Sequence, residues 1–146
     1  MVPGRSAYRA NQDTANQYEL YVINADGSGS STKVSGTMIA NGDAFDFAWS
    51  PDGSRIAYIA DQTSDTLLEV YTSNIDGSDN TRLTAGLSGE EAVEFAWSAD
   101  SERVAFSTGP SGRTPVPDKL YASRPDGGGR LQLNDPTSAG PVSFSY

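Results

Sequence analysis

The chain contains no cysteine and no histidine, and each absence excludes a class of site. Without cysteine there is no thiol nucleophile and no disulfide framework. Without histidine there is no Ser-His-Asp triad, no imidazole base and none of the usual zinc sites. Any chemistry must therefore be carried by carboxylates, hydroxyls, amides and a few basic groups.

Basic residues are also scarce. Ten Lys and Arg stand against nineteen Asp and Glu, which gives a formal net charge of −9 and a pI near 4.2. The basic residues are scattered along the chain and form no stripe interleaved with aromatics. Because an acidic protein repels phosphate backbones and anionic membranes, we expect no nucleic-acid partner and no membrane partner.

Long apolar runs are missing as well. No window of the sequence approaches the length of a membrane span, and the N-terminal segment 1–5 has no apolar stretch of signal-peptide length. We therefore expect a soluble protein, either cytoplasmic or exported with its leader removed. The lack of cysteine fits the cytosol but is equally compatible with export.

The sequence does contain an internal repeat. The segment Phe47-Ala48-Trp49-Ser50 returns as Phe95-Ala96-Trp97-Ser98 at an offset of 48. In the same way, Glu69-Val70-Tyr71 echoes Glu19-Leu20-Tyr21 at an offset of 50, and Leu120-Tyr121 follows after another 50. Three copies of one unit are visible.

Each copy predicts four short strands. Apolar residues alternate with polar ones, or form brief β-branched and aromatic runs, between clusters of Gly, Pro, Asp and Asn. In the best-preserved copy the strands are expected over 44–49, 54–60, 68–74 and 80–84. The composition of segment 90–97 also suits a helix, but its equivalent 42–49 alternates with a period of two, so we predict strand for both.

The second copy resembles the TolB-type, WD-like β-propeller repeat. The residues that carry the resemblance are Trp49-Ser50-Pro51-Asp52-Gly53, Arg55-Ile56-Ala57-Tyr58, Val70-Tyr71, Asp76-Gly77 and Arg82-Leu83-Thr84. The third copy departs from the pattern at Ala99 and Ser101, and the first lacks the Trp-Ser segment. The resemblance implies an all-β fold of four-stranded blades, with six blades in the closed propeller.

The two ends of the repeat array predict a shared blade. The first copy begins near Arg5, at the second strand of the unit, while Val142-Ser143-Phe144-Ser145 matches Phe95-Ala96-Trp97-Ser98 at an offset of 47. Propellers generally have about four to eight blades, so three blades do not readily close into a ring. We therefore predict a homodimer of two three-bladed halves, each completing the first blade of the other.

The predicted organisation is a single propeller-repeat arc over 1–146. Blade one covers 5–35 plus the C-terminal strand 141–146 supplied in trans, blade two covers 44–84 and blade three covers 92–134. The residues expected to close the dimer are Tyr8, Val142, Phe144 and Tyr146. The alternative is an isolated arc with frayed ends, or an arc cut from a longer propeller.

The expected loops differ between the two faces of the arc. The short-turn face carries the turns 24–27, 50–53, 74–77, 98–101 and 124–127. The long-loop face carries longer, chemically varied loops at 11–17, 36–43, 61–66, 85–91, 109–118 and 134–140. This difference favours recognition at the long-loop face or in the central channel.

The candidate binding residues are acidic: Asp43, Asp46, Asp61, Glu90, Glu91 and Glu94. These acids could attract a basic peptide or hold calcium in the channel, although solvated charges at strand ends are the simpler interpretation. We expect no required cofactor and no metal site.

These observations favour a non-catalytic binding or scaffold module that recognises a peptide, a protein or a small ligand. The lack of histidine and cysteine supports this choice over an enzyme. The alternative is a carboxylate-dependent sugar-active enzyme, or the propeller fragment of a peptidase-like enzyme. Paired carboxylates need a defined separation that no sequence supplies, and propeller folds host both classes of function.

Overall fold

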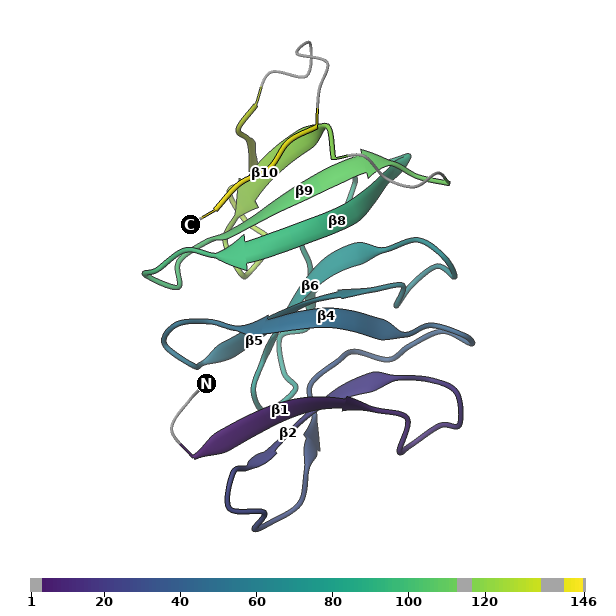
Figure 1. Ribbon diagram of the computed structural model, residues 1–146, viewed down its shortest axis with the longest axis vertical. Helices are drawn as coiled ribbons and strands as arrows, with labels where there is room; N and C mark the ends of the chain where they lie inside the picture. Colours follow the sequence, from purple (N-terminus) through teal and green to yellow (C-terminus); the bar gives the residue numbers. More distant parts are fainter. Residues whose placement is uncertain (1–3, 113–116, 135–140, 146) are drawn as a thin grey trace.

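The computed structural model describes residues 4–112, 117–134 and 141–145. Within these ranges the chain forms eleven β-strands in three antiparallel sheets. No helix that could cross a membrane occurs in them. The sheets lie one above another along the long axis of the molecule, with the first sheet at the bottom of the view and the third at the top (Figure 1).

Each sheet is built from consecutive strands joined as hairpins. The first contains β1 (Arg5–Ala10), β2 (Glu19–Asn24) and β3 (Thr32–Lys33). The second contains β4 (Ala44–Trp49), β5 (Arg55–Ala60), β6 (Glu69–Asn74) and β7 (Thr81–Arg82). The third contains β8 (Glu90–Trp97), β9 (Val104–Pro110), β10 (Lys119–Ser123) and β11 (Leu131–Gln132). The strand order follows the chain order in every sheet.

The predicted strands of the second copy are all present. The bounds of β4 match the prediction, and the other three strands are shorter than predicted at one or both ends. The choice of strand over helix for 90–97 is confirmed, because β8 pairs with β9 from Glu90 to Trp97. Its register shifts between Ala92 and Glu94, and β4 shifts in the equivalent place.

Serine and aspartate close the turns that join the two inner strands. The Ser50 hydroxyl donates to Asp52 at 2.6 Å, and the Ser98 hydroxyl donates to Asp100 at the same distance. Gly53 takes a φ of 72°, and Ser101 adopts a φ of 63° at the equivalent position. The turn of the third sheet therefore keeps its shape without glycine. A left-handed serine there is less favourable than glycine by roughly 1 kcal/mol.

The core is divided between two junctions. One cluster joins the first sheet to the second and includes Leu20, Val34 and Tyr58. The other cluster joins the second sheet to the third, where Trp97 is 7% exposed and its Nε1–H donates to the Ala48 carbonyl at 3.2 Å. The sheets are therefore held together face to face, mainly by apolar burial.

A stacked aromatic pair occupies the same place in each sheet. The ring pairs are Tyr8–Tyr21 at 5.5 Å, Tyr58–Tyr71 at 5.4 Å and Phe106–Tyr121 at 5.5 Å between centroids. Each pair joins directly opposed residues of adjacent strands, the arrangement in which cross-strand side chains interact most strongly. The sequence period thus corresponds to a repeated packing unit.

The first sheet has an open inner edge. Its inner strand β1 pairs only with β2 among the described residues, whereas β5 and β9 are paired on both sides. The segment 141–145 forms no strand, and the Val142 N–H donates to the Pro117 carbonyl of the same chain at 2.7 Å. Tyr146 lies outside the described residues. Pairing of this segment with a second chain stays a prediction.

Candidate functional site

Asp43 and Asp61 are the two predicted acids that the fold brings together. The Asp43 N–H donates to the Asp61 carboxylate at 2.6 Å, and the second oxygen of Asp61 accepts from the Thr66 N–H at 3.2 Å. The Asp43 carboxylate accepts from the N–H of Tyr18, the residue directly before β2, also at 2.6 Å. Both carboxylates therefore fix loops on the long-loop face.

Asp46 and Glu94 lie on the inner strands, at the register shifts of β4 and β8. Asp46 is exposed and accepts from the N–H of its neighbour Phe47 at 3.0 Å. Glu94 is half-buried and accepts from the Ser107 hydroxyl at 3.4 Å. Each of these two carboxylates thus accepts one hydrogen bond among the described residues.

Glu90 lies in a dense polar cluster of the third sheet. Its carboxylate accepts from Thr108 at 2.5 Å, from Lys119 at 2.6 Å and from the Tyr121 hydroxyl at 3.2 Å. Burial alone would raise the pKa of Glu90, but the bonds from Lys119 and Thr108 outweigh it and hold that pKa below its ordinary value. The charged carboxylate is therefore stabilised where it stands.

The second sheet contains a related cluster around Glu69. This carboxylate accepts from Thr63 at 2.6 Å, from the Tyr71 hydroxyl at 2.7 Å and from Arg82 at 3.0 Å. Burial, reinforced by Glu69, raises the pKa of Tyr71 well above its ordinary value. The phenol is therefore a hydrogen-bond donor at neutral pH.

The first sheet repeats the arrangement with Glu19. Its carboxylate accepts from the Tyr21 hydroxyl and from Lys33, each at 3.0 Å. The bond to Glu19 raises the pKa of Lys33. Each sheet thus contains a cluster of one acid, one base and the hydroxyl of the tyrosine that the outer of the two paired strands contributes to the aromatic pair.

The sequence analysis did not select these clusters, apart from Glu90. A signal was present, since Glu19, Glu69 and Lys119 occupy equivalent positions at offsets of 50, two residues before the repeated tyrosine.

The remaining predicted acid, Glu91, is 8% exposed on β8. No group of three acidic side chains in the described part of the chain is arranged to hold a metal ion.

A buried polar network links the first two sheets. The Gly36 N–H points to both the Tyr58 hydroxyl and the Gln62 amide oxygen, each at 3.1 Å. Tyr58 also donates to Gln62 at 2.8 Å and accepts from the Asn80 amide at 2.5 Å. Burial raises the pKa of Tyr58 to about 12, so the hydroxyl keeps its proton. It therefore connects the first two sheets as a stable hydrogen-bond donor and acceptor.

The larger cavity lies on the long-loop face, and we call it the loop pocket. Its volume is about 420 Å³, within the range of small-ligand sites. It is lined by Leu67, Glu69, Arg82, Thr84, Gly86, Leu87, Ser88 and Gly89. The pocket therefore combines one ion pair, two leucines and a glycine-rich loop.

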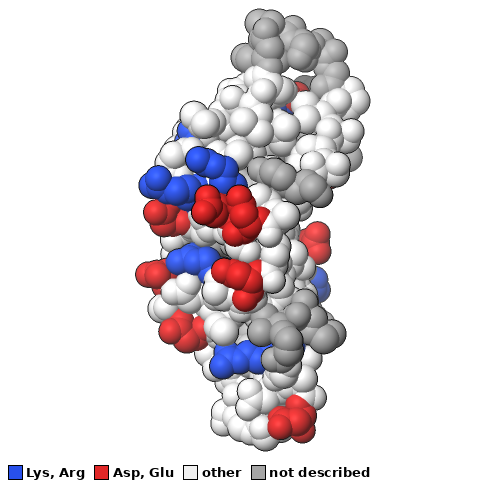
Figure 2. Space-filling model, turned by 90° about the vertical axis from the view of Figure 1, so that its left-hand side faces the viewer, with Lys and Arg blue, Asp and Glu red and all other residues white. Residues whose placement is uncertain are grey.

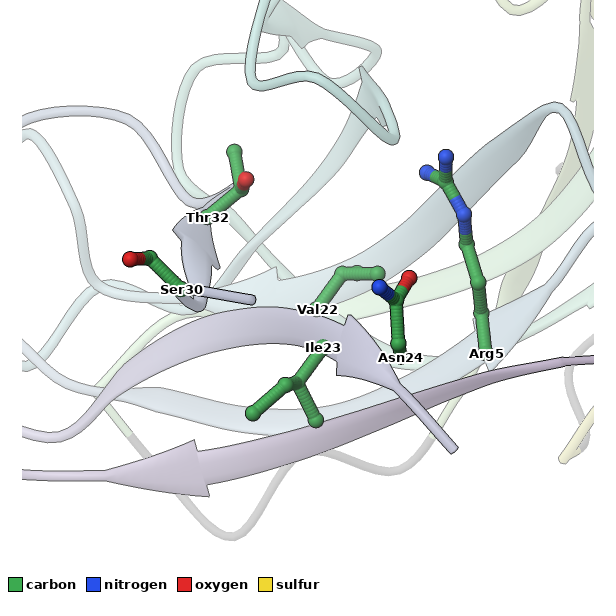
Figure 3. A pocket seen from close by; sticks show the side chains of 6 residues that line it. All are labelled: Arg5, Val22, Ile23, Asn24, Ser30 and Thr32. Atoms are coloured by element: carbon green, nitrogen blue, oxygen red, sulfur yellow. The ribbon is translucent and has the colours of Figure 1, made fainter. Parts of the chain in front are cut away.

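A smaller polar pocket of about 90 Å³ lies at the first sheet. Figure 3 shows Arg5 and Asn24 on one side of it, with Ser30 and Thr32 on the other. The second-sheet equivalent of Arg5, Arg55, forms an ion pair at 3.4 Å, but Arg5 has no such pair in the part of the chain described. The volume of this smaller pocket suits a few water molecules better than a ligand.

Comparison with solved structures identifies the architecture. No family model matches the chain, and no curated protein does either. A protein assigned as TolB from Agrobacterium tumefaciens superposes with a TM-score of 0.62 at 21% identity, over 88% of this chain and 44% of that one. The fold is a TolB-type β-propeller fold. Its sheets are propeller blades, and we number them one to three from here on.

Two oligogalacturonate lyase structures are also similar. One, in complex with manganese, matches 96% of this chain and 35% of its own, with a TM-score of 0.60 at 17% identity. The other, from Vibrio parahaemolyticus, matches 89% and 34%, with a TM-score of 0.57 at 16% identity. The chain thus spans less than half the length of these propellers. Such identities establish the fold alone.

The opposite face of the propeller blades carries the short turns. Figure 2 views the molecule from that side and shows acidic and basic side chains interspersed, with no continuous patch of one sign. Several of these acids close turns; hydrogen bonds from Ser28 and Ser78 lower the pKa values of Asp26 and Asp76. Several of the acidic side chains on this face therefore have a structural role, because they accept hydrogen bonds within their own turns.

Proposed function

We propose that the chain is a non-catalytic binding module. It recognises a peptide, a protein or a small ligand at the long-loop face or central channel of a homodimeric six-bladed propeller. The observation that carries the proposal is the loop pocket, because it lies on the face that the loops make chemically diverse.

The chemistry of the loop pocket fits recognition. Arg82 leaves 39% of its side chain exposed while its partner Glu69 is almost fully buried. An exposed guanidinium beside Leu67 and Leu87 suits a ligand with an anionic or carbonyl group next to an apolar part. Gly86 and Gly89 adopt left-handed φ values, and a β-carbon at either position would meet nothing, so backbone is accessible there.

The state of the predicted acids also supports binding over catalysis. Asp43, Asp61 and Glu90 are occupied by backbone or side-chain donors. An acid–base pair needs one carboxyl group that exchanges protons with substrate, and an acid already saturated with structural donors is poorly placed for that role. Asp46 and Glu94 accept one hydrogen bond each and are more exposed than Glu91, which is 8% exposed, so they are the acids chosen for a test.

The homodimer is supported by a recurring backbone contact. The N–H of Ala44, at the start of β4, donates to the Tyr18 carbonyl of blade one at 2.7 Å, and Ala92 of β8 donates to Leu68 of blade two at 2.8 Å. The bond from Val142 to Pro117 of blade three has the same character. By sequence Val142 matches Phe95, inside the inner strand and not at its start, so the segment 141–145 supplies the later part of an inner strand, and β1 of a second copy offers it an open edge.

Binding and turnover are tested on the same ligands. Calorimetric titration against short acidic peptides and oligogalacturonates is expected to give a ligand that R82Q weakens about tenfold, while R103Q on the short-turn face leaves its affinity unchanged. Mass spectrometry should recover that ligand intact. Conversion to a product that disappears with D46N or E94Q would overturn the proposal in favour of a sugar-active enzyme.

The assembly is tested by mass. Sedimentation should give a particle of twice the 15.4 kDa chain, and removal of residues 141–146 should weaken it. A single-chain mass at working concentration would contradict the homodimer without bearing on ligand binding at the loop pocket.

A further inference from the structure

One leucine of blade three, Leu133, is exposed at a position that the other blades bury, and Leu131, two residues before it, is exposed as well. Leu133 donates its N–H to Leu120, as Leu83 donates to Val70 and Val34 to Leu20. Val34 and Leu83 are 0% and 1% exposed, but Leu133 is 53% exposed and Leu131 is 58% exposed. We call Leu131 and Leu133 the leucine face. The repeat partners of Leu133 show that its position is normally covered, and Thr81, the partner of Leu131 in blade two, is half-buried.

The internal junctions show what covers it. Val34 lies in one core cluster with Ile56 and Tyr58 of blade two, and Leu83 lies in the other with Val104 and Phe106 of blade three. In both cases the cover is the side of the next blade that carries the stacked aromatic pair. The fitting occupant is therefore another blade of this type, presenting that same side.

Blade one presents such a side. Ala7 packs against the core cluster shared with blade two, so its strand neighbour Tyr8 points the other way, because side chains alternate along a strand. Tyr8 and Ile23 are only half-buried, although the equivalent residues Tyr58 and Ser73 are fully buried. We call Tyr8 and Ile23 the tyrosine face. Blade one is thus open on the side that blades two and three use for docking.

The Asp-Gly turns give independent evidence. A β-carbon on Gly77 would lie 2.5 Å from the Lys33 carbonyl of blade one, and one on Gly127 would lie 3.1 Å from Thr81 of blade two. Both turns rest on the outer strand of the preceding blade. Gly27 has the same left-handed φ, but a β-carbon there would meet nothing within 4 Å. Its turn has the shape of a docking element without a partner strand.

We propose that the leucine face of one chain is the docking surface for the tyrosine face of a second copy. The Asp26-Gly27 turn of that copy then lies over β11, as the turn at Gly127 lies over β7. This inference rests on the proposed homodimer and specifies its contact surface. Two such contacts related by a twofold axis complete a ring of six blades, since each chain carries one face of each kind.

The test uses complementary lesions. L131D/L133D alters the leucine face, I23D alters the tyrosine face, and A15D/T37D adds the same charge on exposed loops as a control. Either face variant alone is expected to raise the dimer dissociation constant on the order of 100-fold, because every contact in its homodimer carries a lesion. The control should sediment like the unmodified chain.

Mixing the two face variants provides the decisive measurement. A mixed dimer retains one undamaged contact, so equimolar L131D/L133D and I23D should again form dimers, detected by sedimentation and by native mass spectrometry. Circular dichroism verifies that each variant is folded, which the exposure of Leu131 and Leu133 favours.

Three results would overturn the inference. If L131D/L133D dissociates the dimer but mixing restores nothing, the leucine faces meet each other. If neither variant affects a dimer that does form, the contact lies elsewhere and the homodimer itself stands. If the unmodified chain is monomeric, the second copy is excluded as occupant, and the ligand titrations at the loop pocket still report separately on recognition.

Discussion

Blades two and three surround equivalent tyrosines, Tyr71 and Tyr121, with opposite arrangements of acid and base. In blade two the acid Glu69 precedes Tyr71 on β6, and the base Arg82 follows on β7. In blade three the position of Glu69 holds Lys119, and that of Arg82 holds Gln132. The acid comes instead from Glu90 on the inner strand.

The difference teaches that the fold requires a balanced pair, not a particular residue. A tyrosine hydroxyl and a charge at a partly buried site both need partners, since an unpaired group there is strongly destabilising. Because the pair can reverse between blades while its contacts are kept, we interpret the cluster as a structural brace.

The largest expected effect comes from reversing the base of blade three. K119E places a second carboxylate beside Glu90, so the acceptor of the Tyr121 hydroxyl loses the base that balances its charge. The free energy of unfolding should therefore fall by about 2 kcal/mol, after allowance for the partial exposure of Lys119. Urea denaturation measures the change. R103E, a reversal at an exposed turn, is the matched control, and equal losses for the two variants would argue against a special pair.

Rebuilding the arrangement of blade two inside blade three should recover part of that loss. In E90Q/K119E/Q132R the acid again precedes the tyrosine and the base lies on β11. We expect a gain of about 1 kcal/mol over K119E, since the reversed pair is restored. Absence of any gain would mean that the packing of β8, and not charge balance, determines the stability of the cluster.

Removing the tyrosine hydroxyls should reveal a smaller difference in stability between the two blades. Tyr71 donates to Glu69 at 2.7 Å, whereas Tyr121 is 3.2 Å from Glu90. Y71F should therefore cost about 1 kcal/mol and Y121F less than half of that, as measured by denaturation. A larger loss for Y121F would contradict the ranking by distance.

The smallest effect concerns pH. The pKa of Glu90 is lowered in the folded state, so its contribution to stability is complete above the unfolded pKa near 4.5 and is lost as the pH falls through the folded value. The difference in unfolding free energy between the unmodified chain and E90Q should therefore shrink as the pH falls below about 5. A difference that stays constant over this range would refute the assignment.

Much of the fold was predictable because its signals are local. The alternation of Phe45, Phe47 and Trp49 predicted β4, and the clusters of Gly, Pro, Asp and Asn predicted where the strands are separated. The site was less predictable. The offset of 50 that unites Glu19 with Glu69 leads to Lys119, a base, and nothing in the neighbouring residues indicates that Glu90 replaces the missing acid. That contact spans two strands and depends on how β8 and β10 flank β9.

The sequence by itself determined the repeat, the strands and the turns, since backbone propensity and the alternation of side chains act over a few residues. Tertiary structure decided which charges pair and which apolar side chains stay exposed. Leu83 and Leu133 occupy equivalent places in the repeat, yet only Leu83 has a neighbouring blade to cover it. Burial is a property of the surroundings, and no single position in a sequence contains its surroundings.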